Sequence, residues 1–163
     1  MQTLLLFAHS YFKDSVVNKA LIEEANTLDS VCVQNLSLLY PDYHIDTKAQ
    51  IKLVREAKSI IWQFPLFWYS VPALLKHWQD EVLTPIYREP IFADKSFGVV
   101  STMGGHKSDY EGSNASIEEL LKPIYYGFER RAMRINRHFA FMRRILMPCH
   151  LRSIKSICWA ESA

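Results

Sequence analysis

The run IIWQFPLFWYSVPALLKHWQDEVL, residues 60–83, decides the fold of this chain. Its first residues are apolar enough for a strand buried on both faces, and Pro72 begins a segment with the apolar spacing of a helix. A buried strand that leads through a short loop into a helix is typical of an α/β protein with a parallel sheet. The loop holds Pro65 and Leu66, followed by the aromatic residues Phe67, Trp68 and Tyr69.

The same alternation of strand and helix extends to both sides of this run. We expect strands at residues 3–8, 31–36, 59–64 and 97–102, and helices at 15–28, 46–57, 72–83 and from 116 onward. Asp14 or Ser15 is available to cap the first helix. Right-handed crossovers between such elements give a three-layer, doubly wound parallel sheet, in which ligands bind beyond the carboxyl ends of the strands.

Length and charge limit the classes of protein to consider. The 163 residues, 49% of them hydrophobic, suit a compact core, and the net charge of +2 gives no argument for nucleic acid as a partner. Residues 1–126 carry 11 basic and 15 acidic side chains and form the expected domain. Residues 127–163 carry 8 basic and 2 acidic side chains, and form an atypical basic C-terminal tail.

Cysteine usage and the first residues bear on location. Three scattered cysteines indicate a reducing compartment. The start of the chain lacks the pattern of a signal peptide, and no run approaches the roughly 18 apolar residues of a membrane span. We therefore expect a cytoplasmic protein, at the inner face of a membrane only through a partner. The six histidines lack zinc-ligand spacing, so we expect no metal.

Polar residues around the first helix start could hold an anion. His9, Ser15 and Asn18 lie in or just after the loop that follows the first strand, where free amides and the helix dipole favour a phosphate. The loop contains no glycine, so it is neither a Walker loop nor a dinucleotide fingerprint. An ordinary polar loop with a good helix cap is the alternative interpretation.

The loops after the third and fourth strands could hold a flat conjugated ligand. Ring stacking would explain the three exposed aromatic residues, although aromatic residues also pack interfaces or cover a core. In the next loop, Gly104 and Gly105 let backbone amides approach a ligand, as a flavin carbonyl edge requires, with the hydroxyl of Tyr110 nearby. A Gly-Gly pair can also be a simple tight turn.

Five segments carry a resemblance to a known family. They are AHSYFKDSVVNKALI (8–22), LYPDYHID (39–46), QFPLFWYSVPALLKHW (63–78), STMGGHKSDYEG (101–112) and IEELLKPI (117–124). Over residues 1–124 the chain resembles the flavodoxin-like NAD(P)H:quinone oxidoreductases, or diaphorases. Within that family it is similar to the ancillary subunits of glutathione-regulated potassium efflux antiporters.

The resemblance implies a flavodoxin-like fold, a flavin cofactor (FMN or FAD), NAD(P)H as co-substrate, a quinone or similar electrophile as acceptor, and a homodimer. The implied flavin contacts are His9, Ser15, Asn18, Pro65, Leu66, Phe67, Trp68, Tyr69, Thr102, Gly104 and Gly105. Tyr110 and Trp68 are the implied catalytic residues. The histidine that partners this tyrosine in the mammalian enzymes has no match, and Ser116 stands near its place. A regulatory subunit of a potassium/proton antiporter is the alternative function.

The chain departs from the family in two places. The segment between residues 83 and 97 lacks a longer glycine-rich insert, and after Ile124 the apolar run of a fifth strand is not recognisable. A truncated or frame-shifted, inactive family member is therefore a further alternative, with an incomplete sheet that leaves the fourth strand as an edge. The alternative to a frame shift is a genuine C-terminal helix. Such a helix could present on one face the apolar residues Phe128, Met133, Ile135, Phe139, Met142, Ile145 and Leu146.

Overall fold

The structure is a computed structural model that describes residues 2–136 and 139–141. The strands are β1 (Thr3–Phe7), β2 (Val31–Asn35), β3 (Ser59–Pro65), β4 (Ser96–Thr102), β5 (Arg134–Ile135) and β6 (Phe139–Phe141). The α-helices are α1 (Val17–Ala25), α2 (Leu36–Leu39), α3 (Thr47–Glu56), α4 (Ala73–Trp78), α5 (Thr84–Ile86) and α6 (Ile117–Glu129). Short 3-10 turns cover Phe12–Asp14, Pro90–Phe92 and Lys107–Tyr110, and a π-helical turn at Gln79–Leu83 joins α4 to α5.

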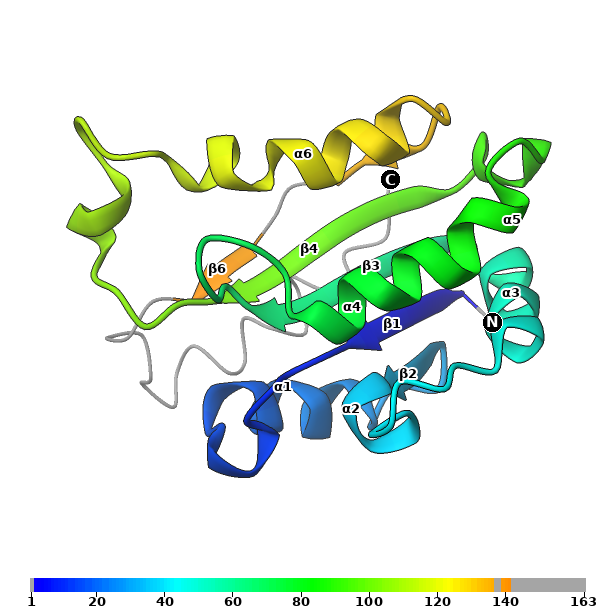
Figure 1. Cartoon of the computed structure of the whole chain (residues 1–163), viewed down its shortest axis with the longest axis horizontal. Helices are drawn as coiled ribbons and strands as arrows, with labels where there is room; N and C mark the ends of the chain where they lie inside the picture. Colours follow the sequence, from blue (N-terminus) through cyan, green and yellow to red (C-terminus); the bar gives the residue numbers. More distant parts are fainter. Residues whose placement is uncertain (1, 137–138, 142–163) are drawn as a thin grey trace.

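The sheet is parallel throughout and has the strand order β2-β1-β3-β4, with β5 and β6 on the outer side of β4. Strands to both sides of β1 arise because the crossovers first run one way and then the other, as in a doubly wound fold. The arrowheads of β1, β3 and β4 point to the same side of the molecule (Figure 1). The predicted fold class is confirmed.

Two groups of apolar side chains cover the two faces of the sheet. On one face, residues of α3, α4 and α6 pack on alternate residues of β1, β3 and β4, and on the other face α1 packs on the residues between them. The five residues of β1 are all buried, which explains their continuous apolar run. The sequence patterns of strands and helices therefore reflect the same two-sided core.

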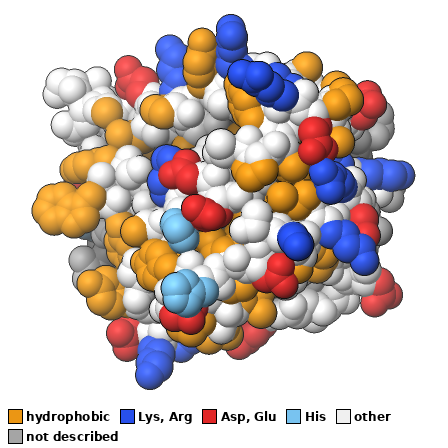
Figure 2. Space-filling model, turned by 45° about the vertical axis from the view of Figure 1, so that its right-hand side comes forward, with side chains coloured by type: hydrophobic (Ala, Val, Ile, Leu, Met, Phe, Trp, Pro, Cys, Tyr) orange, Lys and Arg blue, Asp and Glu red, His pale blue; other side chains and the backbone are white. Residues whose placement is uncertain are grey.

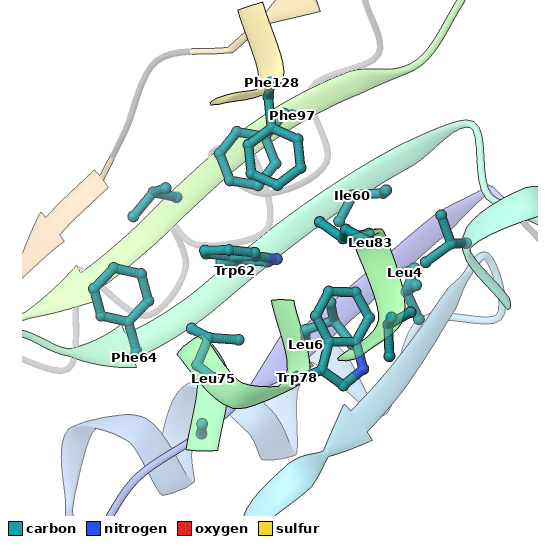
Figure 3. Close-up of a cluster of buried hydrophobic side chains, with 14 of the residues drawn as sticks. Leu4, Leu6, Ile60, Trp62, Phe64, Leu75, Trp78, Leu83, Phe97 and Phe128 are labelled. Atoms are coloured by element: carbon teal, nitrogen blue, oxygen red, sulfur yellow. The ribbon is translucent and has the colours of Figure 1, made fainter. Parts of the chain in front are cut away.

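Aromatic rings form the centre of the first core, which is the apolar group on the face covered by α3, α4 and α6. Trp62 on β3 lies between Trp78 of α4 and the ring pair of Phe97 and Phe128, with ring centroids 6.4 Å from Trp78 and 5.2 Å from Phe128 (Figure 3). Phe97 and Phe128 stack at 3.8 Å. These contacts fix α6 on β4, the strand that leads into one of the polar loops.

Two expectations for the chain after Ile124 are wrong. The β4 strand is not left as an edge, because β5 pairs with its beginning and β6 pairs with its end. The single apolar helix face is also wrong, because Ile135 and Phe139 lie in these strands. Each strand is only two or three residues long, which explains why no strand pattern is visible. Met142, Ile145 and Leu146 lie outside the described residues.

The predicted boundary at residue 126 falls inside α6, which continues to Glu129. After the helix, Met133 is buried in the first core. The distinct tail at 127–163 stays a prediction, since residues 142–163 lie outside the described part. Within the part that is described, no helix is both long enough and apolar enough to cross a membrane.

Candidate functional site

The loops after β1, β3 and β4 meet at the carboxyl edge of the sheet. The backbone N–H of Ala8 donates to the carbonyl of Gln63 at 3.3 Å, and the N–H of Leu66 donates to the carbonyl of Thr102 at 2.8 Å. Pro65 and Thr102 are also partners in the register of β3 and β4. The three loops singled out from the sequence are therefore held together by backbone hydrogen bonds.

A strained aromatic turn follows β3. The backbone groups of Phe67 and Ser70 bond to each other in both directions, at 3.1 and 2.9 Å, and enclose Trp68 and Tyr69. Both enclosed residues have a positive φ, +48° and +60°, as in the type I′ turns that usually hold Asn-Gly. A large residue in this conformation costs about 1–3 kcal/mol. The side chains gain little burial in return, since Trp68 is 95% and Tyr69 64% exposed.

His9 lies against this turn with a defined tautomer. Its ring meets the ring of Phe67 edge to face at 5.5 Å, and its Nδ1 accepts the backbone N–H of Tyr11 at 2.9 Å. Burial lowers the pKa of His9 and outweighs the opposite effect of the Asp14 carboxylate. The imidazole is therefore neutral near pH 7, with its proton on Nε2 as a donor.

Ser37 of α2 fixes the backbone of His9. Its hydroxyl accepts the N–H of His9 at 2.9 Å and donates to the carbonyl of the same residue at 3.1 Å. A hydroxyl can do both at once because it carries one hydrogen and two lone pairs. Sequence reasoning missed this residue, because nothing in the run around it indicates a contact with residue 9.

The first turn of α1 is open to an anion. The expected cap by Asp14 or Ser15 is wrong, because the helix begins after Val16 and no side chain caps it. Asp14 ends a 3-10 turn instead, and Ser15 follows that turn. The ammonium group of Lys19 donates to the carbonyl of Lys13, which brings positive charge to this loop. An uncapped helix start beside a lysine favours a phosphate.

The side chain of Asn18 bonds to other residues of the site, and its contact with a phosphate stays a prediction. Its side chain is only 2% exposed and points into the molecule, where its amide donates to the Thr102 hydroxyl at 2.9 Å. Gln63 of β3 donates to the side-chain oxygen of Asn18 at 3.2 Å. Sequence reasoning missed Gln63, although a polar residue inside the apolar run IIWQFP was a signal.

The two glycines after β4 differ in what they allow. A Cβ atom at Gly104 would meet nothing within 4 Å, so its backbone is open to a ligand. A Cβ atom at Gly105 would lie 2.8 Å from the Asp109 carboxylate and 3.2 Å from the Tyr110 hydroxyl. That carboxylate cannot easily move, because it accepts the backbone N–H of His106 at 2.8 Å. A side chain at position 105 would therefore have to displace the Asp109 carboxylate and the Tyr110 ring.

The hydroxyl of Tyr110 keeps its proton. Burial, with smaller effects from Tyr69 and Asp109, raises the pKa of its hydroxyl, so it stays protonated. The effect of Tyr69 on the pKa of Tyr110 also indicates that the aromatic turn lies near the glycine loop, the loop after β4 that holds Gly104 and Gly105. Ser116, which stands near the place of the missing histidine, caps α6 by accepting the Glu119 N–H at 3.2 Å.

The structure thus brings together most of the predicted site residues. His9 joins Phe67, Pro65 and Leu66 join Thr102, Gly105 joins Tyr110, and Asn18 reaches Thr102 from below. Trp68 is 95% exposed, and Ser15 is half-buried beside the start of α1.

A hollow lies on the surface away from these loops. It has a volume of about 470 Å³ and is lined by Tyr43, His44, Ile45, Asp46, His77 and Glu81. Figure 2 shows histidine and acidic side chains side by side on the surface. None of the predicted site residues lines this hollow, so it is separate from the candidate site.

Comparison with other proteins gives consistent results. A family model described as a flavodoxin-like fold matches residues 1–144, which extends beyond the 124 residues of the resemblance. The glutathione-regulated potassium-efflux system ancillary protein KefF of Citrobacter koseri is 38% identical over 126 residues, covering 74% of this chain and 72% of the relative.

Two solved structures are similar over nearly the whole chain. The general stress protein 14 of Treponema denticola, in complex with FMN, has a TM-score of 0.83 and 26% identity, covering 95% of this chain and 92% of its own. An NADPH-quinone reductase from P. pentosaceus has a TM-score of 0.83 and 25% identity, covering 94% of this chain and 93% of its own.

Proposed function

Because the chain belongs to the flavodoxin-like family that includes the potassium-efflux ancillary proteins, we propose that it is a flavin-dependent oxidoreductase that passes electrons from NAD(P)H to quinones or similar electrophiles. The FMN in the Treponema structure supports FMN as the cofactor, and the name of the P. pentosaceus protein supports NADPH and a quinone as substrates. We further propose a cytoplasmic homodimer.

Three features of the site fit a flavin nucleotide. The uncapped first turn of α1 and the donor proton of His9 suit a phosphate. The aromatic turn suits a flat ring system, and the open backbone at Gly104 suits a carbonyl edge. When bound, a flavin accepts a hydride from a nicotinamide and passes two electrons to an acceptor.

The residues of the chain have separate tasks in this proposal. The first turn of α1 and His9 hold the phosphate, and the turn at Trp68 and Tyr69 provides a stiff surface against which planar molecules orient. The N–H groups near Gly104 and the Tyr110 hydroxyl donate hydrogen bonds to developing negative charge. Because Tyr110 keeps its proton, it acts as a donor and not as a base.

The strained aromatic turn is the observation that carries the proposal. Two large side chains held at positive φ and left exposed lower the stability of the chain, and such strain persists where function requires it. A planar ligand that stacks on these rings provides that reason.

An absorbance spectrum of the purified protein tests the cofactor, followed by heat release and chromatography of any chromophore. We expect FMN at about one per chain after loading, and oxidation of NADPH or NADH that depends on an added quinone. A protein that takes up neither FMN nor FAD would exclude this function.

The likeness to KefF supports a second candidate function, namely an ancillary subunit of a potassium efflux system. In that case the same flavin residues bind the cofactor, and the protein contacts a membrane antiporter. Co-purification with the antiporter from the same cells distinguishes the two, with a Trp68→Ala variant to establish whether flavin is needed for the contact. An enzyme without this second function is recovered alone.

A further inference from the structure

A buried chain of hydrogen bonds runs beneath the glycine loop. Gln63 of β3 donates from Nε2 to the side-chain oxygen of Asn18 at 3.2 Å and to its carbonyl at 3.4 Å. Asn18 of α1 donates from Nδ2 to the hydroxyl oxygen of Thr102 at 2.9 Å. The exposed fractions of the three residues are 2%, 2% and 7%. These hydrogen bonds therefore link β3 and β4, from which two of the site loops start, to α1, at which the first site loop ends.

The hydrogen bonds have one direction. Gln63 donates to Asn18, and Asn18 accepts at its side-chain oxygen and donates from its nitrogen, so the donors point from Gln63 through Asn18 to Thr102. Thr102 accepts from Asn18, which leaves its own hydrogen for another acceptor. Bonds in such a series polarise one another, which makes the last hydroxyl a better donor.

Thr102 is also fixed through its backbone. Its carbonyl accepts the N–H of Leu66 at 2.8 Å, which ties it to the start of the aromatic loop, and Gly104 follows two residues later. Because Asn18 engages one lone pair of this hydroxyl from within the molecule, the hydroxyl hydrogen is restricted to directions away from Asn18 before any ligand arrives.

We propose that Gln63 and Asn18 are positioning residues that make Thr102 a directed hydrogen-bond donor to the polar edge of the flavin. The side chain of Asn18 acts on Thr102 and not on the phosphate, whereas its backbone N–H belongs to the first turn of α1. The inference rests on the proposed function, because it requires a flavin in the site. It adds Gln63, a residue outside the predicted set.

The Asn18→Asp substitution provides a sharp test. An ionised carboxylate can only accept, so the Thr102 hydroxyl turns inward and is lost to the flavin, whereas a protonated carboxyl can again donate to Thr102. Binding of riboflavin and FMN is titrated by fluorescence from pH 5 to 9, in the oxidised state and in the dithionite-reduced state. Riboflavin has no phosphate, so its binding is free of direct charge repulsion at that group.

We expect binding of reduced flavin by Thr102→Val to weaken about tenfold more than binding of oxidised flavin, as for one hydrogen bond to a charged group. Asn18→Asp should resemble the wild-type protein at low pH and Thr102→Val at high pH. In the double variant Asn18→Asp/Thr102→Val this pH dependence should be absent. Thr102→Ser, which keeps the hydroxyl, should restore the wild-type ratio of affinities.

Gln50→Leu is the matched control for Gln63→Leu. Gln50 is equally buried and makes three amide hydrogen bonds, with Gln34, Tyr40 and Trp78, but none with the site loops. Both substitutions should lower stability in urea unfolding. Only Gln63→Leu should change the ratio of oxidised to reduced flavin affinity.

Several outcomes would overturn the inference. Wild-type affinity ratios in Thr102→Val and Asn18→Asp would do so, as would a pH dependence that persists in the double variant. If Thr102→Val does not fold, Thr102→Ala against Thr102→Ser provides the same comparison. If the wild-type chain binds no flavin, both this inference and the proposed function fail, whereas loaded wild-type protein with unaffected variants removes the inference alone.

Discussion

Replacing Trp68 by asparagine should make the protein more stable and a poorer flavin binder. Trp68 has a φ of +48° and is 95% exposed, so its removal relieves strain and loses almost no buried contact. A left-handed conformation costs an ordinary residue about 1–2 kcal/mol, and asparagine tolerates it better. We expect a gain of about 1 kcal/mol, or roughly 2–4 °C in Tm for a chain of this size.

The same substitution should weaken FMN binding although it raises stability. Stacking of one aromatic ring contributes about 1 kcal/mol beyond its buried area, so FMN should bind roughly fivefold or more weakly. Urea unfolding of flavin-free protein gives the stability, and fluorescence titration gives the affinity. Tyr126→Asn is the control, because Tyr126 is also exposed but has a helical backbone. A destabilised Trp68→Asn would refute the strain, and unchanged FMN affinity would refute the stacking.

Further substitutions address the neighbours of the turn and the core. Tyr110→Phe should leave Tm within about 1 °C and slow flavin reduction in stopped-flow absorbance, since one donor to developing charge is lost; equal rates would remove Tyr110 from the site. Ser37→Ala should cost about 1–2 kcal/mol in urea unfolding and weaken FMN binding, while Ser37→Thr retains both, because only a hydroxyl serves both backbone groups of His9. Phe128→Ala should cost about 3–5 kcal/mol in the same assay, because its stacked ring is buried; a loss below about 1 kcal/mol would contradict the packing. Since burial lowers the pKa of His9, the unfolded chain binds a proton first as pH falls below about 6.5, and stability should decline there. His9→Gln should lose that part of the pH dependence.

The sheet and the location of the site could be predicted because they depend on local patterns. Continuous apolar runs mark β1, β3 and β4, and the order of strand and helix places their loops at one edge. The helix cap was wrong because residues 12–14 form a separate turn, which moves the start of α1 beyond Ser15. The capping preference of Asp14 and Ser15 was therefore overridden by the conformation of the preceding loop.

Contacts between distant residues could not be predicted from patterns. Gln63 meets Asn18 across 45 positions, and Ser37 meets His9 across 28, with no sequence signal that joins them. The left-handed turn was hidden for a different reason, because tryptophan and tyrosine disfavour the conformation that they adopt there. The strands β5 and β6 are too short for an alternating pattern.

The exposure of Trp68 gives this protein a built-in optical probe. Trp62 and Trp78 are fully buried, so a water-soluble quencher such as iodide reaches neither ring but reaches Trp68. Trp159 lies outside the described residues, and its substitution by phenylalanine would leave one accessible emitter among the other three. The quenchable fraction of the emission then reports directly on the aromatic turn, and a molecule that covers the ring should shield it. Occupancy of the turn could be followed in this way with colourless compounds, which have no absorbance signal of their own.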